Sequence, residues 1–256
     1  MGRLDGKVAL ITGGESGIGL STAELFLSEG ACVQVVGIDE SKMGTAVQRL
    51  GAQNGADKML GSVADVTDEQ AVVRAVTEGV DRHGRLDIVI SNAGITGEVI
   101  DLVNYPADAF VHTLAVHVTG AFHVLKHAIP HVSDGGSIVI TSSVVGLIGA
   151  PNVSAYVTAK HAQVGLMRAA AKELAPRRIR VNSLHPGPTS TAFQDSIEMR
   201  ATGLPREEAA KAFEAMIPLG RHTTTQEIAQ AMLYLASDES AMVTSHTFSI
   251  DGGMSG

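Results

Sequence analysis

The sequence predicts an α/β protein folded as one doubly wound domain, with a parallel sheet covered by helices on both faces. Three observations predict this class. Short β-branched runs alternate with longer amphipathic stretches, the apolar fraction of 45% can form a large core, and 28 glycines suit many tight turns between strands and helices. No linker, repeat or low-complexity segment interrupts the chain, so we expect a single domain over residues 1–256.

Seven apolar segments predict the strands of a seven-stranded sheet. They are Val8–Thr12, Cys32–Gly37, Lys58–Val63, Leu86–Ser91, Ser137–Thr141, Ile179–Leu184 and Thr247–Ile250. Apolar residues at helical spacing lie between them, near Ile18–Ser28, Lys42–Leu50, Asp68–His83, Ala107–His127, Ala155–Ala175 and Gln226–Ala236. Strands that alternate with helices form right-handed βαβ units, so the strands should be parallel.

The segment 189–218 breaks this alternation because it is polar and rich in helical patterns. In a doubly wound fold, ligands bind outside the carboxyl ends of the strands. An insertion after a late strand can cover that cleft. We therefore expect residues 189–218 to cover the substrate, and Val144, Val145, Pro151 and Val153 to line the same apolar pocket.

Charge and composition exclude several classes of function. The net charge of −8 argues against a nucleic-acid surface, which needs clustered cations. The single cysteine, Cys32, permits neither an internal disulfide nor a cysteine-based metal site. The amino terminus lacks an apolar signal core, and no apolar run reaches about 18 residues. The expectation is a soluble cytoplasmic protein without a membrane partner.

A glycine-rich turn follows the first predicted strand. The residues Gly13-Gly14-Glu15-Ser16-Gly17-Ile18-Gly19 lead directly into a helix. Such a turn lets the backbone approach a pyrophosphate at the helix N-terminus, where free N–H groups and the helix dipole favour anions. Any tight turn favours glycine, so this motif alone is weak evidence, and its place after the first strand strengthens it.

A tyrosine and a lysine lie one helical turn apart in Tyr156-Val157-Thr158-Ala159-Lys160. An ammonium beside a phenol favours the phenolate and lowers a pKa near 10, so the phenol can exchange a proton with an alcohol or ketone oxygen. Taken alone, this spacing is common on exposed helices. Ser143, thirteen positions before Tyr156 and just after the fifth strand, adds a hydroxyl to the same cleft.

Together these motifs resemble the short-chain dehydrogenase/reductase family over roughly residues 4–253. The resemblance implies a Rossmann-type fold and hydride transfer between a nicotinamide dinucleotide and a secondary alcohol or ketone. It implies that Tyr156 is the general acid/base and that Lys160 lowers its pKa and binds ribose. Ser143 would hold the substrate oxygen.

The resemblance also implies a set of cofactor-binding residues. Asp65 and Val66 would face the adenine, and Asn92, Ala93 and Gly94 would line the cleft. Pro186, Gly187, Thr189 and Thr191 would hold the carboxamide. The remaining positions are Gly13, Ser16, Gly17, Ile18 and Gly19 in the turn, with Tyr156 and Lys160.

The end of the second strand favours NAD over NADP. Gly37 stands where NAD-preferring relatives carry an acid, and Ile38 stands where NADP-preferring relatives often carry arginine. A 2′-phosphate needs a cation, and Glu15, Ser16, Ile38 and Asp39 supply none. Asp39 is expected to reach the ribose hydroxyls, and the alternative is an ordinary solvated loop carboxylate.

His117 departs from the family pattern, which has asparagine at this position to help place a water that connects the lysine to solvent. Imidazole can donate and accept, and its pKa near 6.5 predicts a titration in the working range. We therefore assign His117 to proton transfer, with simple packing as the alternative. His112, His123 and His127 fall near one helical face without accompanying acids or cysteines, so no catalytic metal is expected.

Other functions fit parts of this pattern. A dinucleotide-binding sensor or scaffold with little turnover would not need Ser143, Tyr156 and Lys160. A 3-oxoacyl-carrier-protein reductase is a second alternative, although the acidic balance gives little sign of a basic docking patch. The enoyl reductases of this fold space their tyrosine and lysine more widely. Because family members pair through the helices at 107–127 and 155–175, we expect a homotetramer.

Overall fold

The computed structural model describes residues 2–256, and a seven-stranded sheet forms its centre. The strands are β1 (Val8–Thr12), β2 (Cys32–Gly37), β3 (Met59–Val63), β4 (Leu86–Ser91), β5 (Val132–Thr141), β6 (Arg180–Pro186) and β7 (Thr247–Ile250). Their order in the sheet is β3-β2-β1-β4-β5-β6-β7, and all neighbouring strands are parallel. The expected doubly wound, Rossmann-type fold is confirmed.

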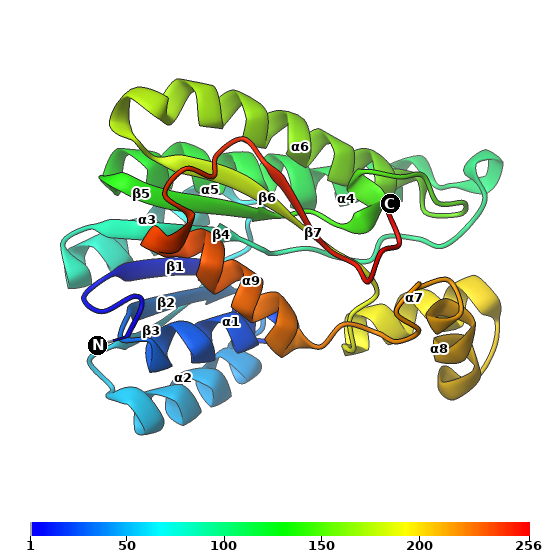
Figure 1. Ribbon diagram of the computed structural model, residues 1–256, viewed down its shortest axis with the longest axis horizontal. Coiled ribbons are helices and arrows are strands. Elements are labelled where there is room, and N and C mark those ends of the chain that lie inside the picture. Colours follow the sequence, from blue (N-terminus) through cyan, green and yellow to red (C-terminus); the bar gives the residue numbers. More distant parts are fainter. Residues whose placement is uncertain (1) are drawn as a thin grey trace.

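Helices cover both faces of this sheet (Figure 1). One face carries α3 (Glu69–His83), α4 (Ala107–Leu114), α5 (Gly120–Ala128) and α6 (Ser154–Leu174), and the other carries α1 (Gly17–Ser28), α2 (Glu40–Asn54) and α9 (Thr225–Ala236). Each face has its own apolar core, one around Met167 and the other around Phe26. Because the sheet is buried on both sides, β1 and β4 consist almost entirely of apolar residues.

Two elements differ from the expected ones in an informative way. β5 begins at Val132, five residues earlier than expected, through a polar stretch where its register on β4 shifts between Leu86 and Ile88. The helix expected over 107–127 is interrupted by a wider π turn at Ala115–Thr119. A π turn often marks a functional site, and this one contains His117.

The chain winds outward from β1 and β4 in opposite directions, which opens a crevice at their carboxyl ends. The helices α7 (Ala192–Thr202) and α8 (Arg206–Glu214) stand beyond the end of the sheet, away from the layers that cover its faces (Figure 1). No helix within residues 2–256 has the length and apolar character needed to cross a membrane.

Candidate active site

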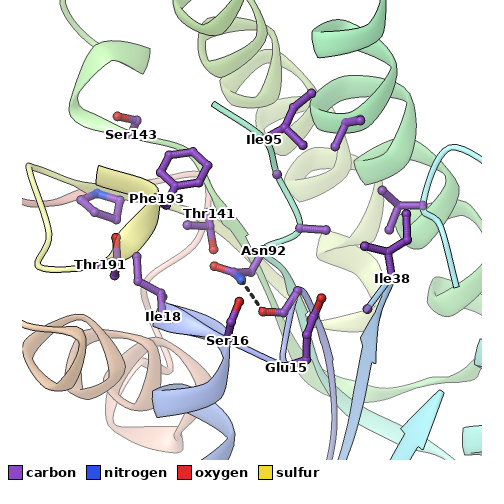
Figure 2. A pocket seen from close by; sticks show the side chains of 18 of the residues that line it. Glu15, Ser16, Ile18, Ile38, Asn92, Ile95, Thr141, Ser143, Thr191 and Phe193 are labelled. Carbon is purple, nitrogen blue, oxygen red and sulfur yellow. Dashed lines mark hydrogen bonds between the residues drawn. The ribbon is translucent and has the colours of Figure 1, made fainter. Parts of the chain in front are cut away.

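One cleft runs along the carboxyl ends of strands β1 to β6 and collects most of the expected site residues (Figure 2). Its lining includes Gly13, Ser16, Gly17, Ile18, Asp65, Val66, Asn92, Ala93, Gly94, Ser143, Tyr156, Lys160, Pro186, Gly187, Thr189 and Thr191. Ser143 and Phe193 lie toward one side of the view, and Glu15 and Ile38 lie toward the other. Residues from six strand ends are thus brought to one surface.

The glycine turn fits a pyrophosphate for steric and electrostatic reasons. Gly13 and Gly17 have positive φ angles of 62° and 52°, which glycine adopts without strain. A Cβ at Gly19 would lie 2.1 Å from the Gly13 carbonyl oxygen, so the turn closes only with glycine there. Within the described chain Ser16 makes no side-chain cap on α1, which leaves the first N–H groups of that helix for an anion.

Asn92 fastens the turn after β4 to the turn after β1. Its side-chain amide donates to the carbonyl oxygens of Thr12 and Gly13, at 3.1 and 3.3 Å. The Thr12 hydroxyl in turn accepts from the backbone N–H groups of Asn92 and Ala93. These bonds hold the two strand ends together where the crevice opens.

The lysine and tyrosine of α6 enter this cleft side by side. The Lys160 Nζ atom donates to the Thr141 carbonyl oxygen at 2.8 Å and lies 5.3 Å from the Tyr156 ring centre. Ser143 follows β5, and its carbonyl oxygen lies 2.8 Å from Nδ1 of the buried His185. The three residues expected to carry the chemistry therefore share one end of the cleft.

Burial is the largest influence on the pKa values of Tyr156 and Lys160. It raises the pKa of the Tyr156 phenol above its ordinary value, and a hydrogen bond with Ser143 opposes this only in part. Burial also lowers the pKa of Lys160 to about 7. The expected lowering of the phenol pKa by Lys160 is therefore not found, because both groups lose solvation on burial.

His117 lies behind Tyr156 rather than on the cleft surface. Its ring meets the Tyr156 ring edge to face at 5.2 Å between centres, and its Nε2 lies 2.8 Å from the Ile95 carbonyl oxygen. Burial, and then the charge of Lys160, lower the pKa of His117 to about 3. The expected titration in the working range is therefore wrong, and the imidazole is neutral there.

Gln163 is a polar residue that the sequence motifs did not reveal. Its side-chain oxygen accepts from Lys160 Nζ at 3.1 Å, and its Nε2 donates to the His117 carbonyl oxygen at 2.8 Å. It therefore links the lysine to the π turn. The only sequence signal is a glutamine three positions after Lys160, on a helix face that is otherwise buried and apolar.

Asp39 does not take the position expected for it. Its carboxylate accepts from the backbone N–H of Lys42 as the N-cap of α2 and forms an ion pair with the Lys42 ammonium at 3.0 Å. Within residues 2–256 it is not among the residues that line the cleft. The acid that lines the cleft beside Gly37 and Ile38 is Glu15. The sequence alone identifies Glu15 only as a residue that offers no positive charge to a 2′-phosphate.

The segment 189–218 approaches the catalytic end through α7. The Phe193 ring lies 6.2 Å from the Tyr156 ring, and Arg200 donates to the Gly97 carbonyl oxygen and the Thr96 hydroxyl, at 2.8 and 2.7 Å. α7 is thereby fastened to the loop after β4. In the described chain the cleft lining contains Phe193 and Gln194 but not Val144, Val145, Pro151 or Val153, which corrects the expected apolar wall.

Two other histidines of this region have protein partners, and His112 lines the cleft. His123 Nδ1 lies 3.0 Å from the Val66 carbonyl oxygen, and His127 Nε2 lies 2.8 Å from a Glu69 carboxylate oxygen. Across residues 2–256 there is no group of three or more His, Cys, Asp or Glu side chains that could hold a metal ion.

Comparisons with known proteins agree with this geometry. A family model described as enoyl-(acyl carrier protein) reductase matches residues 13–255. A 3-oxoacyl-(acyl-carrier-protein) reductase of Thermotoga maritima is 38% identical, with 98% of this chain and 99% of that protein covered. Secoisolariciresinol dehydrogenase of Forsythia intermedia is 40% identical, with 99% and 90% covered. The structure of carveol dehydrogenase from Mycobacterium avium in complex with NAD matches with a TM-score of 0.93 and 32% identity, over 99% of both chains.

Proposed function

The chain belongs to the short-chain dehydrogenase/reductase family, and on this premise we propose that it transfers a hydride between NAD(H) and a secondary alcohol or ketone. Family membership makes it an oxidoreductase that uses a nicotinamide dinucleotide. The observation that carries the finer proposal is the meeting of Ser143, Tyr156 and Lys160 in the cleft that begins at the glycine turn.

Each of these three residues has a distinct role. Tyr156 donates a proton to the ketone oxygen in reduction and takes it from the alcohol in oxidation. Ser143 donates a hydrogen bond to the same oxygen and stabilises the charge that develops on it. Protonated Lys160 stabilises the phenolate and binds the nicotinamide ribose, and because burial lowers its pKa to about 7, this stabilisation weakens as the pH rises above that value. When bound, the dinucleotide supplies the hydride donor or acceptor.

The residues that would hold the dinucleotide follow the strand ends. The free N–H groups at the start of α1 would bind the pyrophosphate, and Asp65 and Val66 would face the adenine. Asn92, Ala93 and Gly94 would contact the middle of the dinucleotide. Pro186, Gly187, Thr189 and Thr191 would hold the carboxamide.

NAD is proposed over NADP because the lining near Gly37 and Ile38 contains the acid Glu15 and, in the part of the chain described, no lysine or arginine other than Lys160. A 2′-phosphate would bring about two negative charges beside Glu15, and the nearby cation, Lys42, is already paired with Asp39.

We assign His117 and Gln163 to the proton path as positioning residues. Gln163 connects Lys160 to the His117 carbonyl oxygen, and the His117 ring supports Tyr156. The neutral imidazole is the working form because a second cation beside Lys160 is unfavourable.

For the substrate, Phe193 and Ile95 give the catalytic end an apolar character, and we propose that segment 189–218 covers it as part of one domain. A 3-oxoacyl thioester on a carrier protein is a second candidate, since one relative is named as such a reductase. An acidic carrier protein would need lysine or arginine side chains near the cleft to dock. Arg200 and Arg206 on α7 and α8 are already paired with Glu98 and Asp195, which favours a small alcohol.

The test is a panel of secondary alcohols, ketones and a 3-oxoacyl thioester, followed by NADH absorbance, with Tyr156→Phe. This change removes the transferable proton and keeps the ring, so turnover should fall at least about a hundredfold while the Kd for NADH stays within about twofold. Tyr234→Phe, far away on α9, is the matched control. Near-normal turnover in Tyr156→Phe would contradict the mechanism. Binding without turnover on any substrate would favour the sensor or scaffold role.

A further inference from the structure

The carboxylate of Glu15 lies where a side chain of residue 37 would be. A Cβ built at Gly37, the last residue of β2, would lie 2.1 Å from Glu15 Oε2 and 2.2 Å from its carboxyl carbon. Gly37 is not among the residues with positive φ, so the backbone does not require glycine. The space that a side chain would enter here is occupied by the carboxylate at the end of Glu15.

This carboxylate also has an unused hydrogen-bonding atom. Glu15 Oε2 is shielded from solvent and, among residues 2–256, has no hydrogen-bond partner. A buried carboxylate oxygen without a donor is costly, which indicates that a donor arrives with a ligand. Glu15 lines the cleft beside Gly37 and Ile38, on the side away from Ser143 (Figure 2).

The nearby cation Lys42 does not satisfy Glu15. The hydrogen bond with Asp39 raises the pKa of Lys42, and the charge of Glu15 adds a smaller effect. The Lys42 ammonium lies 3.0 Å from the Asp39 carboxylate and is largely exposed. Lys42 is thus the ion-pair partner of Asp39, and the Glu15 carboxyl group faces the cleft without it.

We propose that Glu15 accepts hydrogen bonds from the 2′- and 3′-hydroxyls of the adenosine ribose and excludes a 2′-phosphate. This inference rests on the proposed use of NAD. In dinucleotide folds this role commonly belongs to an acid about 20 residues beyond the glycine turn. Here the acid has moved into the turn itself, and Gly37 makes room for it. The carboxylate offers two acceptors to a diol and repels a phosphate.

Binding of dinucleotides in the absence of substrate tests this assignment directly. Isothermal titration calorimetry measures the Kd values of the parent protein and of Glu15→Ser for three dinucleotides. These are NAD, NADP and 2′-deoxy-NAD, which lacks the 2′-hydroxyl of the adenosine ribose. The parent should bind NAD at least about tenfold more tightly than either analogue, as expected for a charge-assisted hydrogen bond. Glu15→Ser should bind NAD and 2′-deoxy-NAD equally well. Glu40→Gln, an exposed acid in the first turn of α2, is the matched control and should behave as the parent.

A pair of variants tests the shared space. Gly37→Asp alone should weaken NAD binding, because two acids then compete for one volume. Combining it with Glu15→Ser should restore both the affinity and the preference over NADP. Recovery only in the double variant would support the proposal, and a double variant as weak as Gly37→Asp would overturn it.

The outcomes separate this inference from the proposed function. If the parent binds neither dinucleotide, both are overturned. If the parent prefers NADP and Lys42→Ala abolishes that preference, NAD use and the Glu15 role fail together. If the parent prefers NAD and Glu15→Ser keeps the same preference and the same penalty for 2′-deoxy-NAD, only the role of Glu15 is overturned.

Discussion

At the scale of single residues, His117 shows how burial changes the chemistry that a side chain can do. The ring is almost completely buried, and its Nε2 is engaged with the backbone of Ile95. Its Nδ1 is buried without a partner among residues 2–256. A pKa of about 3 keeps the ring neutral, so the role that we propose for His117 rests on its position and hydrogen bonding rather than on titration.

We predict that His117→Leu slows turnover at least about tenfold. A tenfold loss is a modest share of the rate acceleration that general acid–base catalysis provides. His117→Asn should keep most of the activity. Gln163→Leu should also slow turnover, because it removes the side chain that links Lys160 to the backbone carbonyl oxygen of residue 117. The measurement is kcat and kcat/KM from pH 5 to 9. With a pKa of about 3, His117 itself adds no inflection in this range.

His127→Leu is the control, since His127 contacts Glu69 on α3 and not the catalytic pair. A His117→Leu protein that matches the parent across pH 5 to 9 would leave the residue a packing role.

The sequence predicted the site well where a role follows from spacing along one segment. Tyr156 and Lys160 share a helix face, and the glycine turn is continuous, so local rules suffice. The roles of Glu15 and Gln163 depend on contacts between segments. Glu15 meets Gly37 across two strand ends, and Gln163 reaches the backbone of His117, so neither contact could be read from spacing. Asp39 is held by the local N-cap contact with Lys42 at the start of α2.

At the scale of elements, His222 joins α7 and α8 to the chain before α9. Its Nε2 lies 2.6 Å from the buried Glu198 of α7, and its Nδ1 lies 3.2 Å from Glu214 of α8. Burial lowers the pKa of His222, but the hydrogen bonds to Glu198 and Glu214 outweigh it, so the pKa is raised. The charged imidazole thus holds the two helices in place.

This contact predicts a pH dependence for substrate binding. Because the pKa is raised in the folded protein, the stabilisation is complete below about pH 6.5 and is lost as the pH rises through the raised value. The KM for substrate should therefore rise several-fold toward alkaline pH. In His222→Gln the KM should be high already at pH 6, and the free energy of unfolding should fall by roughly 1–3 kcal/mol.

Steady-state KM from pH 6 to 9 and urea unfolding check this, with the exposed His131→Gln as control. Equal pH profiles for the parent and His222→Gln would show that the contact does not control the covering segment.

The sequence predicted the residues over which the helix at 107–128 extends, but not the π turn that interrupts it. Apolar spacing cannot distinguish one continuous helix from two joined by a π turn. Directly after that turn, Gly120 packs so closely on Val66 that a Cβ would lie 2.6 Å from its side chain, a contact between segments that apolar spacing does not reveal. Likewise, the early start of β5 runs through Asp134-Gly135-Gly136, whose polar and glycine residues give no strand signal.

At the scale of the whole molecule, the parallel sheet and its two-sided core follow from the alternating pattern, because buried parallel strands need helices on both faces. The surface leaves some apolar side chains uncovered. Val111 on α4 is 63% exposed and Phe122 on α5 is 47% exposed, on the helices through which we expect subunits to pair.

We predict a homotetramer, with a light-scattering mass about four times the 26.5 kDa of one chain at micromolar concentration. Val111→Asp combined with Phe122→Asp should lower that mass, because two buried charges oppose association. Val63→Asp, at an exposed apolar position on the edge strand β3, is the control. A monomeric mass for the parent protein would contradict the prediction.

The sharing of one volume by Glu15 and Gly37 also has an evolutionary consequence. A lineage that moves its acid from the turn to the strand end must change both codons. On the proposed role of Glu15, we expect either change alone to weaken NAD binding, through loss of the acid or through two carboxylates placed together. Epistasis of this kind would separate the two arrangements by a fitness valley. The acid in the turn should therefore persist among descendants of this chain even where the surrounding cleft diverges.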